Sequence, residues 1–365
     1  MQPVAQTGGS DQGLLAMVRS LPTDRFEVHV VVPEDPALRA QLEIAGATIH
    51  VVPMRRLTRS EGAAYWLGYA LGWPVAVMRL VALVRQTGAN AIVSNSLHSW
   101  YGWGAAWLTR RPHVWIAREI VVQSAAVSRL ERVLTGRFAT VVVSMSHAIA
   151  AQLVPRDGRV FTDAVDTERF RPDRACSFRA EHGIADDTVL VGAAGRIDTW
   201  KGLEVLLDAW AILAPEAPDL ELVVAGPPVP GKEAYERRLR ERANALPHVR
   251  WLGPVDDLAS FYPDLDVFVL PSTDPEPYGL VMAEALASGV PVIATDHGGP
   301  PEVIGGHPER GMLVRPGDPL ALADAIRAYA GTRSSATTRA AREPLFVAEP
   351  PPWAELLDEV ARRGR

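Results

Sequence analysis

Cysteine is almost absent from this sequence of 365 residues, which contains only Cys176. A single thiol cannot form an internal disulfide bond, and this favours a protein of a reducing compartment. A secretory signal is also missing, because Met1–Thr7 include polar residues and a proline where a signal would be basic and then apolar. We therefore expect a cytoplasmic protein.

Long apolar runs are scarce as well. A mainly apolar, uncharged run of sixteen residues extends from Ala63 to Met78 and contains Pro74. Because a helix needs about 20 apolar residues to cross a bilayer, we expect no transmembrane helix. We interpret the run as a buried helix or helix pair that ends at Arg79.

Positive charge is not in excess, since 37 lysines and arginines stand against 43 acidic residues and the net charge is -6. This balance argues against nucleic acid as a partner, because binding to phosphates requires a strongly basic face. The sequence has no cluster with the spacing of a zinc site. Asp264 and Asp266 have the spacing of a metal-binding pair, but Asp266 leads directly into an apolar strand and lies at the wrong edge of the sheet. We expect no bound metal.

The sequence does contain a regular alternation of short β-branched runs with amphipathic stretches, which is typical of parallel sheets covered by helices. The residues on one face of such a helix are Leu203, Leu206, Leu207, Trp210 and Leu213. The strand candidates are Glu27–Val32, Thr48–Val52, Ala91–Ser94, His113–Ala117, Thr140–Val143, Val189–Ala193, Leu220–Ala225, His248–Leu252, Asp266–Leu270, Pro291–Ala294 and Met312–Val314.

A break in this alternation near Asp166–Asp187 marks a domain boundary, because charged residues and Pro172 separate the last strand of the first half from a new strand–loop–helix unit. The sequence therefore predicts two Rossmann-like α/β domains that face each other across a cleft. We place the first domain at residues 1–168 and the second at residues 169–348. A closing helix in residues 349–365 is expected to cross back to the first domain.

The first domain lacks a recognisable first strand. In a doubly wound domain a buried strand leads into the first glycine turn, whereas only Met1–Thr7 precede Gly8 and Gly9 here. We therefore expect a gap in the middle of the first sheet and a natural chain that starts further upstream.

Two glutamates, Glu276 and Glu284, follow the strand Asp266–Leu270. A proline-containing loop and Gly289 frame a helix that begins near Gly279. Glu276 then lies in the loop and Glu284 about one and a half turns into the helix, so both carboxylates can accept hydrogen bonds from sugar or ribose hydroxyls. The positive end of the helix dipole suits a diphosphate. Taken alone, the pair is better explained as a solvated helix residue and a neighbour of the N-cap.

Two cations, Arg196 and Lys201, flank the turn after the strand Val189–Ala193. Ligands of open α/β sheets bind at the carboxyl ends of strands, and two cations there can neutralise a departing diphosphate. A solvated surface residue is the simpler explanation for either cation alone. Two of them at one strand-to-helix turn favour a binding role.

Weaker signals lie elsewhere. Gly8 and Gly9 permit close approach of the backbone to a phosphate or an acceptor, although a plain turn explains them equally well, and the same applies to His297-Gly-Gly-Pro-Pro-Glu302. Arg118 could contact phosphate or acceptor. His98 is another candidate on the acceptor side, although a loop histidine with an internal partner is the simpler interpretation.

Together these segments resemble the retaining glycosyltransferases of family 4, which have the GT-B fold. The resemblance covers nearly the whole chain and is most specific from Val189 to Val314. The family's Glu-x7-Glu signature is matched by Glu276 and Glu284. Its other motifs are matched by Gly8, Gly9, Gly195, Arg196, Lys201, Gly202 and the segment Ser144-Met-Ser-His147.

The resemblance implies transfer of a hexosyl unit from a nucleotide-diphosphate sugar to a glycan, lipid or small-molecule acceptor. It implies retention of the anomeric configuration by front-face attack, without a metal or other cofactor. Arg196 and Lys201 would hold the diphosphate, Glu276 the donor sugar and Glu284 the ribose. The remaining donor-binding residues would be Gly8, Gly9, Gly195, Tyr278, Gly279 and Leu280.

Two departures from the family concern the acceptor side. The chain has Asp163-Ala-Val-Asp166 where members often carry Asn-Gly-Val-Asp, and Arg118-Glu119 where many carry a histidine near the reaction centre. With the missing first strand, these departures leave open a catalytically inactive nucleotide-sugar-binding protein. A sugar-nucleotide epimerase of the same architecture is a second alternative.

A membrane surface is a further candidate partner, because cations beside aromatic residues can bind anionic lipid and the family often uses lipid-linked acceptors. Core packing of the aromatic residues and solvation of the arginines are the simpler explanation. Peripheral association with the inner face of a membrane is therefore carried as a hypothesis. The residues concerned are Arg55, Arg56, Arg59, Tyr65, Trp66 and Trp73.

Overall fold

The chain divides into two compact units in the computed structural model, which describes residues 1, 8–55, 62–122, 124–255, 257–331, 339 and 341–364. The first unit comprises Met1–Ala164 and Glu349–Arg365, and the second comprises Val165–Ala348. The sequence placed the first boundary slightly later, at residue 168. Val165 and Phe170 belong to the second unit, where both are buried.

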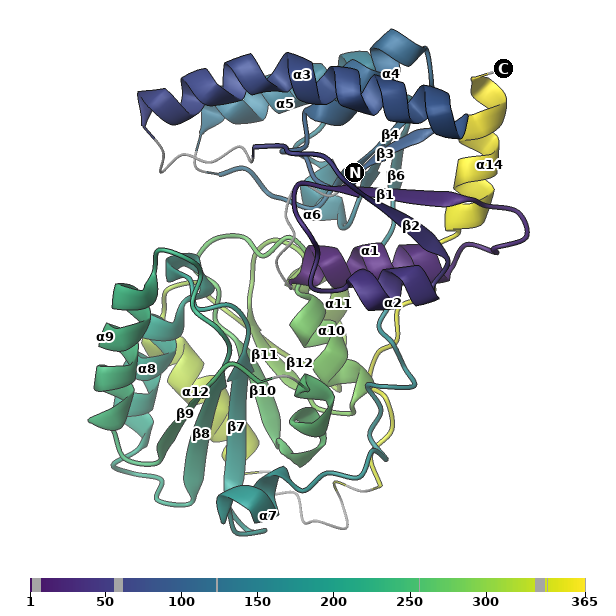
Figure 1. The fold of residues 1–365 in the computed structure, drawn as a ribbon. Coiled ribbons are helices and arrows are strands. Elements are labelled where there is room, and N and C mark those ends of the chain that lie inside the picture. The colour runs from purple at the N-terminus through teal and green to yellow at the C-terminus, as the bar shows by residue number, and fades with distance from the viewer. Residues whose placement is uncertain are drawn as a thin grey trace. The chain divides into compact units, whose positions relative to one another are not determined.

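The first unit contains two parallel sheets (Figure 1). One pairs β1 (Val28–Val32) with β2 (Ala47–Val51), and the other has the strand order β3-β4-β5-β6. The strands of this second sheet are β3 (Ile92–Ser94), β4 (His113–Ala117), β5 (Val141–Ser144) and β6 (Gly158–Val160). β4 and β5 are buried throughout, as their continuous apolar runs require.

Within the described part of the chain, these two sheets are not joined by a strand. The sequence predicts that a first strand is missing before the glycine turn, and residues 2–7 of that segment lie outside the described residues. The amino group of Met1 donates to the Val93 carbonyl (2.6 Å), and the Asn95 N–H donates to the Met1 carbonyl (2.9 Å). Met1 therefore lies beside the end of β3.

Seven helices, within the residues that the structure describes, accompany these sheets. They are α1 (Gly9–Arg19), α2 (Arg39–Ile44), α3 (Ala63–Thr87), α4 (Tyr101–Thr109), α5 (Ala125–Phe138), α6 (His147–Ala150) and α14 (Trp353–Arg363). The closing helix predicted at the end of the chain is α14, and it packs on the first unit. Its Trp353 contacts Phe161 edge-on at 5.0 Å between ring centroids, and its Asp358 pairs with Arg25.

Helix α3 corrects one expectation. It does not end at Arg79 but continues to Thr87 as one helix of 25 residues with Pro74 inside it. Arg79 lies on the exposed face, and Leu80 and Val81 continue the buried face. Ala64–Thr87, with a mean hydropathy of 1.7 and 33% of its best window buried, is long and apolar enough to cross a membrane by length and composition. The core helix of a soluble protein can meet the same criterion.

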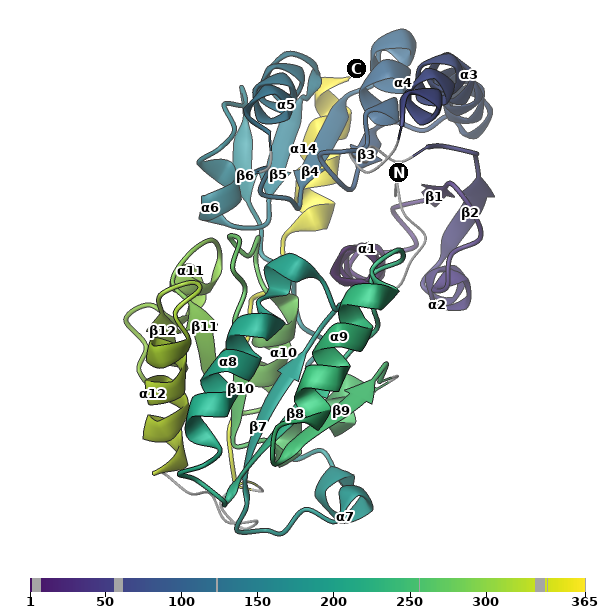
Figure 2. The ribbon, with the colours of Figure 1, turned by 90° about the vertical axis from the view of Figure 1, so that its left-hand side faces the viewer.

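The second unit is built on a six-stranded parallel sheet with the order β12-β11-β10-β7-β8-β9. Its strands are β7 (Val189–Ala194), β8 (Leu220–Ala225), β9 (Val249–Gly253), β10 (Val267–Leu270), β11 (Val292–Thr295) and β12 (Gly311–Val314). The helical segments are α7 (Phe178–His182), η1 (Thr199–Lys201), α8 (Leu203–Leu213), α9 (Glu233–Asn244), η2 (Leu258–Ser260), η3 (Tyr262–Asp264), α10 (Leu280–Ala287), α11 (Pro300–Ile304) and α12 (Pro319–Ala330). Figure 2 shows α8, α9 and α12 side by side on one face of this sheet.

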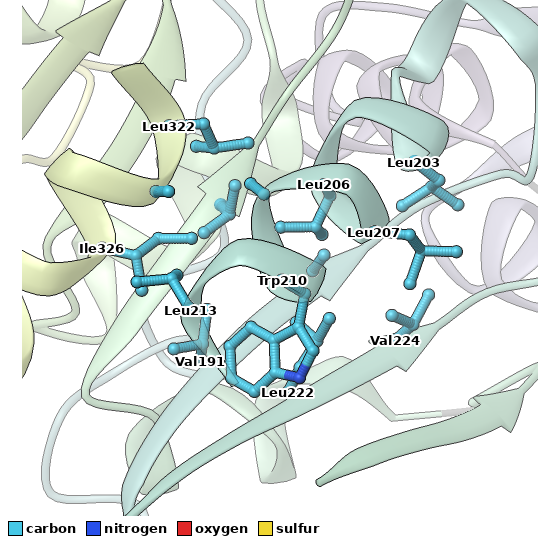
Figure 3. Close-up of a cluster of buried hydrophobic side chains, with 14 of the residues drawn as sticks. Val191, Leu203, Leu206, Leu207, Trp210, Leu213, Leu222, Val224, Leu322 and Ile326 are labelled. Atoms are coloured by element: carbon cyan, nitrogen blue, oxygen red, sulfur yellow. The ribbon is translucent and has the colours of Figure 1, made fainter. Parts of the chain in front are cut away.

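The core of the second unit lies between α8 and the sheet (Figure 3). Leu206 and Trp210 of α8 are completely buried against Val191 and Leu222 of the central strands. The Trp210 indole N–H donates to the Pro247 carbonyl (3.0 Å), so the burial of this polar atom costs little. The predicted apolar face of α8 is therefore confirmed, and it fixes the turn that precedes the helix.

The GT-B architecture predicted from the sequence, with two Rossmann-like domains and a closing helix, is confirmed. All eleven predicted strands are present, each within about a residue of its predicted ends. The sequence did not indicate β6, which has three residues and no apolar run.

Candidate functional site

The predicted site of the second unit lies where the direction of its sheet reverses. From β7 the chain proceeds outward through β8 and β9, and it then returns to the other side of β7 to form β10, β11 and β12. The carboxyl ends of β7 and β10 therefore meet at the topological switch point, which is where open α/β sheets bind their ligands. The loops that follow these two strands carry Arg196, Lys201 and Glu276.

Lys201 and Glu276 are in direct contact. The Lys201 ammonium donates to Oε2 of Glu276 (2.7 Å), and the Ser272 hydroxyl donates to the same oxygen (2.8 Å). The ammonium also lies 4.1 Å from the centroid of the Trp200 ring. Both members of the pair are largely shielded from water, which strengthens their interaction.

The turn after β11 clamps the loop that carries Glu276. The Gly299 N–H donates to the Glu276 carbonyl (2.7 Å), and Glu276 forms an isolated parallel bridge with Gly298. Gly298 has a φ of +77°, and a Cβ there would lie 2.2 Å from the Glu276 carbonyl oxygen, so only glycine fits. The weak glycine signal in this segment thus has a structural role, which is to fix the position of Glu276.

Arg196 stands apart from the Lys201 pair. Its neighbours hold the loop in place, because the Ile197 N–H donates to the Pro227 carbonyl (2.8 Å) and Asp198 pairs with Lys232. The Arg196 side chain itself is exposed and has no hydrogen bond or ion pair to the described residues. Its guanidinium is therefore available to an anion.

Glu284 is not a solvated helix residue. It is 8% exposed on α10, and the Tyr262 hydroxyl donates to its Oε2 (3.0 Å). Burial raises the pKa of Glu284 to about 7, although the hydrogen bond from Tyr262 and the charge of Arg169 act in the opposite direction. The structure gives Glu284 and Glu276 different partners. Tyr262 and Ser272, which hold the two carboxylates, were not predicted as site residues.

The N-terminus of α10 lies beside Glu276, as the sequence predicts. Gly279 is its N-cap, with a φ of +89°, and a Cβ there would lie 3.4 Å from Cγ of Glu276. The helix begins at Leu280, whose N–H belongs to the first turn that has no acceptor within the helix. Tyr278, which precedes the N-cap Gly279, is buried. The glutamate, the cations and these N–H groups are therefore gathered at one edge of the sheet.

The predicted acceptor-side residues of the first unit have internal partners. Arg118 is 7% exposed at its side chain, pairs with Asp163 (2.5 Å) and donates from Nε to Oδ1 of Asn95 (2.7 Å). A Cβ at Gly13 of α1 would lie 2.5 Å from its guanidinium. His98 Nδ1 lies 2.7 Å from Oε1 of the buried Glu131. His98 is therefore a histidine with an internal partner in this structure. A role for Arg118 or His98 in acceptor binding remains a prediction.

The glycine loop of the first unit starts α1. Gly8 is the N-cap in extended conformation and Gly9 the first helical residue, and the Asp11 N–H donates to the Gly8 carbonyl (3.0 Å). A contact of these glycines with a ligand remains a prediction.

The Asp264–Asp266 pair lies at the opposite edge of the second sheet. Asp266 accepts from Nη2 of Arg179 (2.7 Å) and from the Leu190 N–H (2.8 Å), at the start of β7 and β10. Asp264 accepts from the Arg179 N–H (2.8 Å). Within the described residues, no group of three or more histidines, cysteines or carboxylates is arranged to hold a metal ion.

Comparison with known families gives a match within the second unit. Residues 188–331 match the family described as glycosyl transferases group 1. This segment contains every predicted site residue of the second unit.

Among curated proteins, the chain is 34% identical over 199 residues to the lipopolysaccharide core biosynthesis mannosyltransferase LpsB of Rhizobium meliloti, covering 53% of this chain and 56% of LpsB. It is 32% identical over 276 residues to a D-inositol 3-phosphate glycosyltransferase of Streptomyces avermitilis, covering 73% of this chain and 56% of that protein. The chain thus matches a little more than half the length of these two relatives.

Among solved structures, Anabaena HepE in complex with UDP and glucose has the same fold. Its TM-score is 0.78 at 23% sequence identity, with 99% of this chain and 98% of that chain covered.

Proposed function

From the match of residues 188–331 to the glycosyl transferases group 1, we propose that the chain transfers a hexosyl unit from a nucleotide-diphosphate sugar to an acceptor. The observation that carries the proposal is the contact of Lys201 with Glu276 at the switch point of the sheet. The exposed Arg196, which has no partner among the described residues, lies on the same loop as Lys201. Glycan, lipid and small-molecule acceptors fit this reaction equally. The reaction would take place in the cytoplasm, with peripheral association at the inner face of a membrane.

The electrostatics of the site suit a diphosphate leaving group. As the bond between sugar and phosphate breaks, negative charge develops on the diphosphate, and fixed cations stabilise that charge. Arg196 and Lys201 would supply two such charges, and the first N–H groups of α10 would add a third set of donors. We propose that these groups take the place of a metal ion.

The carboxylates would orient the donor. When a diphosphate draws Lys201 away, Oε2 of Glu276 is left to accept a hydrogen bond from a sugar hydroxyl, while Ser272 keeps the carboxylate in place. Glu284, held by Tyr262, would accept from the ribose. Neither carboxylate is needed as a nucleophile, so we propose front-face attack with retention, in which a leaving phosphate oxygen accepts the acceptor's proton.

The relatives support a hexosyl donor. LpsB is named as a mannosyltransferase, and structures of HepE contain UDP, glucose and UDP-glucose. UDP is therefore the first nucleotide to test, with GDP, ADP and dTDP beside it.

The first test is thermal unfolding of the full chain with each nucleotide in the presence of a chelator. A ligand that binds only the folded state stabilises it by RT ln(1 + [L]/Kd), about 2.7 kcal/mol at a hundredfold excess over Kd. We expect one nucleotide to raise the unfolding midpoint. Lys201→Ala should remove the shift, whereas Arg237→Ala, a change of an exposed arginine on α9, should keep it. The absence of any shift in a folded sample would contradict the donor site.

A second measurement separates the alternative functions. The nucleotide sugar of the stabilising nucleotide is incubated with and without candidate acceptors, and its products are identified by mass spectrometry and NMR. Transfer to an acceptor with an unchanged anomeric configuration supports the proposal. Conversion of the donor to its 2-epimer without an acceptor would indicate an epimerase, and binding without turnover would indicate an inactive binding protein.

A further inference from the structure

Helix α3 is apolar on both its faces. Its inner face, which includes Tyr69, Val77 and Leu80, is buried in the core of the first unit. Its outer face carries a row of small and apolar residues three or four positions apart, which we call the α3 stripe. The α3 stripe consists of Ala64, Leu67, Leu71, Val75, Met78 and Ala82, all exposed.

The exposure of the α3 stripe is large for apolar side chains. The exposed fractions are 62% for Leu67, 68% for Leu71, 54% for Val75 and 55% for Met78. Single exposed apolar residues are common on protein surfaces, but a contiguous row along a helix of roughly 37 Å is not. A helix that is apolar all round normally has both faces covered. The α3 stripe therefore has the character of a surface that a partner covers.

The charges around the α3 stripe are positive. α3 contains Arg79 and Arg85, both exposed, and no acidic residue. Residues 62–140 carry eight arginines and two glutamates, although the whole chain has a net charge of -6. Both glutamates have internal partners, because Glu119 accepts from the Leu97 N–H (2.9 Å) and the buried Glu131 contacts His98. The exposed charge of this region is thus basic.

The helices beside α3 hold it in place. Trp73 of α3 lies 5.3 Å from Trp103 of α4 between ring centroids, and Trp103 stacks on Phe138 of α5 at 4.5 Å. Figure 2 shows α4 beside α3, with α3 at the outer edge. Because its inner face is packed in this way, α3 can present its outer face to a partner but cannot leave the core to span a bilayer without exposing the residues beneath it.

We propose that the α3 stripe binds the surface of an anionic lipid bilayer. The helix would lie parallel to the membrane, with the α3 stripe in the headgroup region and Arg79 and Arg85 against lipid phosphates. Partly exposed Trp66 suits the same interface. A second copy of the chain is disfavoured as the occupant, because two such faces would bring arginines together. No step of the proposed sugar transfer is needed for this binding.

The test is flotation of the full chain with vesicles of phosphatidylcholine alone and of phosphatidylcholine mixed with phosphatidylglycerol. We expect flotation with the anionic vesicles only, and a loss of more than tenfold in partitioning for the double variant Leu71→Glu with Val75→Glu. The matched control is Leu320→Glu, which changes a leucine of similar exposure (64%) on α12 of the second unit and should bind as the unchanged protein does. Thermal unfolding of each variant verifies that it is folded.

A second pair of variants tests the charge contribution. Arg79→Gln with Arg85→Gln should weaken binding to anionic vesicles by roughly tenfold to thirtyfold at low salt, and Arg237→Gln should not. Equal flotation with neutral vesicles, no flotation at all, or full binding by the Leu71→Glu with Val75→Glu variant would overturn the proposal. A dimer in solution that these glutamates dissociate would assign the α3 stripe to a second copy. The nucleotide-induced shift, measured on the same variants, reports separately on the donor site.

Discussion

Arg118 and Arg196 occupy similar places in the two units and have opposite environments. Each follows a strand of a parallel sheet, β4 or β7, and each was predicted to bind a ligand. Arg118 is buried and bonded to Asp163 and Asn95, whereas Arg196 is exposed and has no partner within the described residues. The position at a strand's end therefore does not decide whether an arginine is exposed or paired within the fold. We expect a ligand-binding arginine to be one whose guanidinium the fold leaves exposed, as it does for Arg196.

The carboxylates show the same contrast. Glu131 of the first unit is buried against His98, which can balance its charge. Glu284 of the second unit is buried against an uncharged tyrosine and has a pKa raised to about 7. A buried carboxylate without a cation in contact destabilises the fold at neutral pH, and such groups cluster at functional sites.

The largest effect that this comparison predicts is on the stability of the first unit. Arg118→Ala leaves the buried Asp163 without its cation, and we expect a loss of about 3–5 kcal/mol in the free energy of unfolding. Urea denaturation followed by far-UV circular dichroism measures this loss. Arg156→Ala, which removes an exposed arginine of the same unit, should change stability by less than about 0.5 kcal/mol. Normal stability with lost transfer activity in Arg118→Ala would instead make Arg118 an acceptor-binding residue.

Much of the fold could be predicted because its signals are local. Parallel strands covered on both faces are continuous apolar runs, and several of the eleven predicted strands were recognised in this way. β6 was missed because Gly158–Val160 has no such run. The length of α3 was misjudged because Arg79 interrupts the apolar sequence but lies on the outer face, where a charge does not end a helix.

The site could be predicted only as far as its motifs reach. The spacing of Glu276 and Glu284 and the turn with Arg196 and Lys201 are contiguous patterns, and Lys201 was correctly expected near the strand's end. The hydrogen bond from Tyr262 to Glu284 depends on how η3 packs against α10, which no local pattern encodes. The pairing of Arg118 with Asp163 joins residues far apart in the chain and is hidden for the same reason.

The second-largest predicted effect is on the free energy of unfolding of the second unit, which should depend on pH through Glu284. Glu284 has a pKa of about 7 in the folded state and ordinarily 4.5, so below pH 4.5 it is protonated in both states and its contribution to stability is fully present. As the pH rises from 4.5 to about 7, the unfolded chain ionises first and up to about 3 kcal/mol of stability is lost. Glu284→Gln should remove this loss, so that the variant is more stable than the unchanged protein at pH 8 but not at pH 4.5.

The measurement is the difference in unfolding free energy between Glu284→Gln and the unchanged protein at several pH values, in which the other titrating groups cancel. Glu241→Gln, on the exposed side of α9, is the matched control and should give a flat difference. A flat difference for Glu284→Gln as well would mean that its carboxylate is not held in its neutral form.

The smallest effect on stability, and the sharpest test of the comparison, is expected at Arg196. Because its side chain has no partner within the described residues, Arg196→Ala should leave the unfolding free energy within about 0.5 kcal/mol. It should nevertheless weaken nucleotide diphosphate binding by roughly tenfold, as expected for one charge-assisted hydrogen bond. Isothermal titration calorimetry and urea denaturation of the same sample measure both quantities.

Arg196→Lys keeps the charge but not the planar donor pair, and it should recover part of the affinity. Unchanged affinity would place Arg196 with the solvated arginines. A large loss of stability would show that the Arg196 guanidinium makes a stabilising interaction in the folded protein. Arg196 and Arg118 would then no longer differ in this respect.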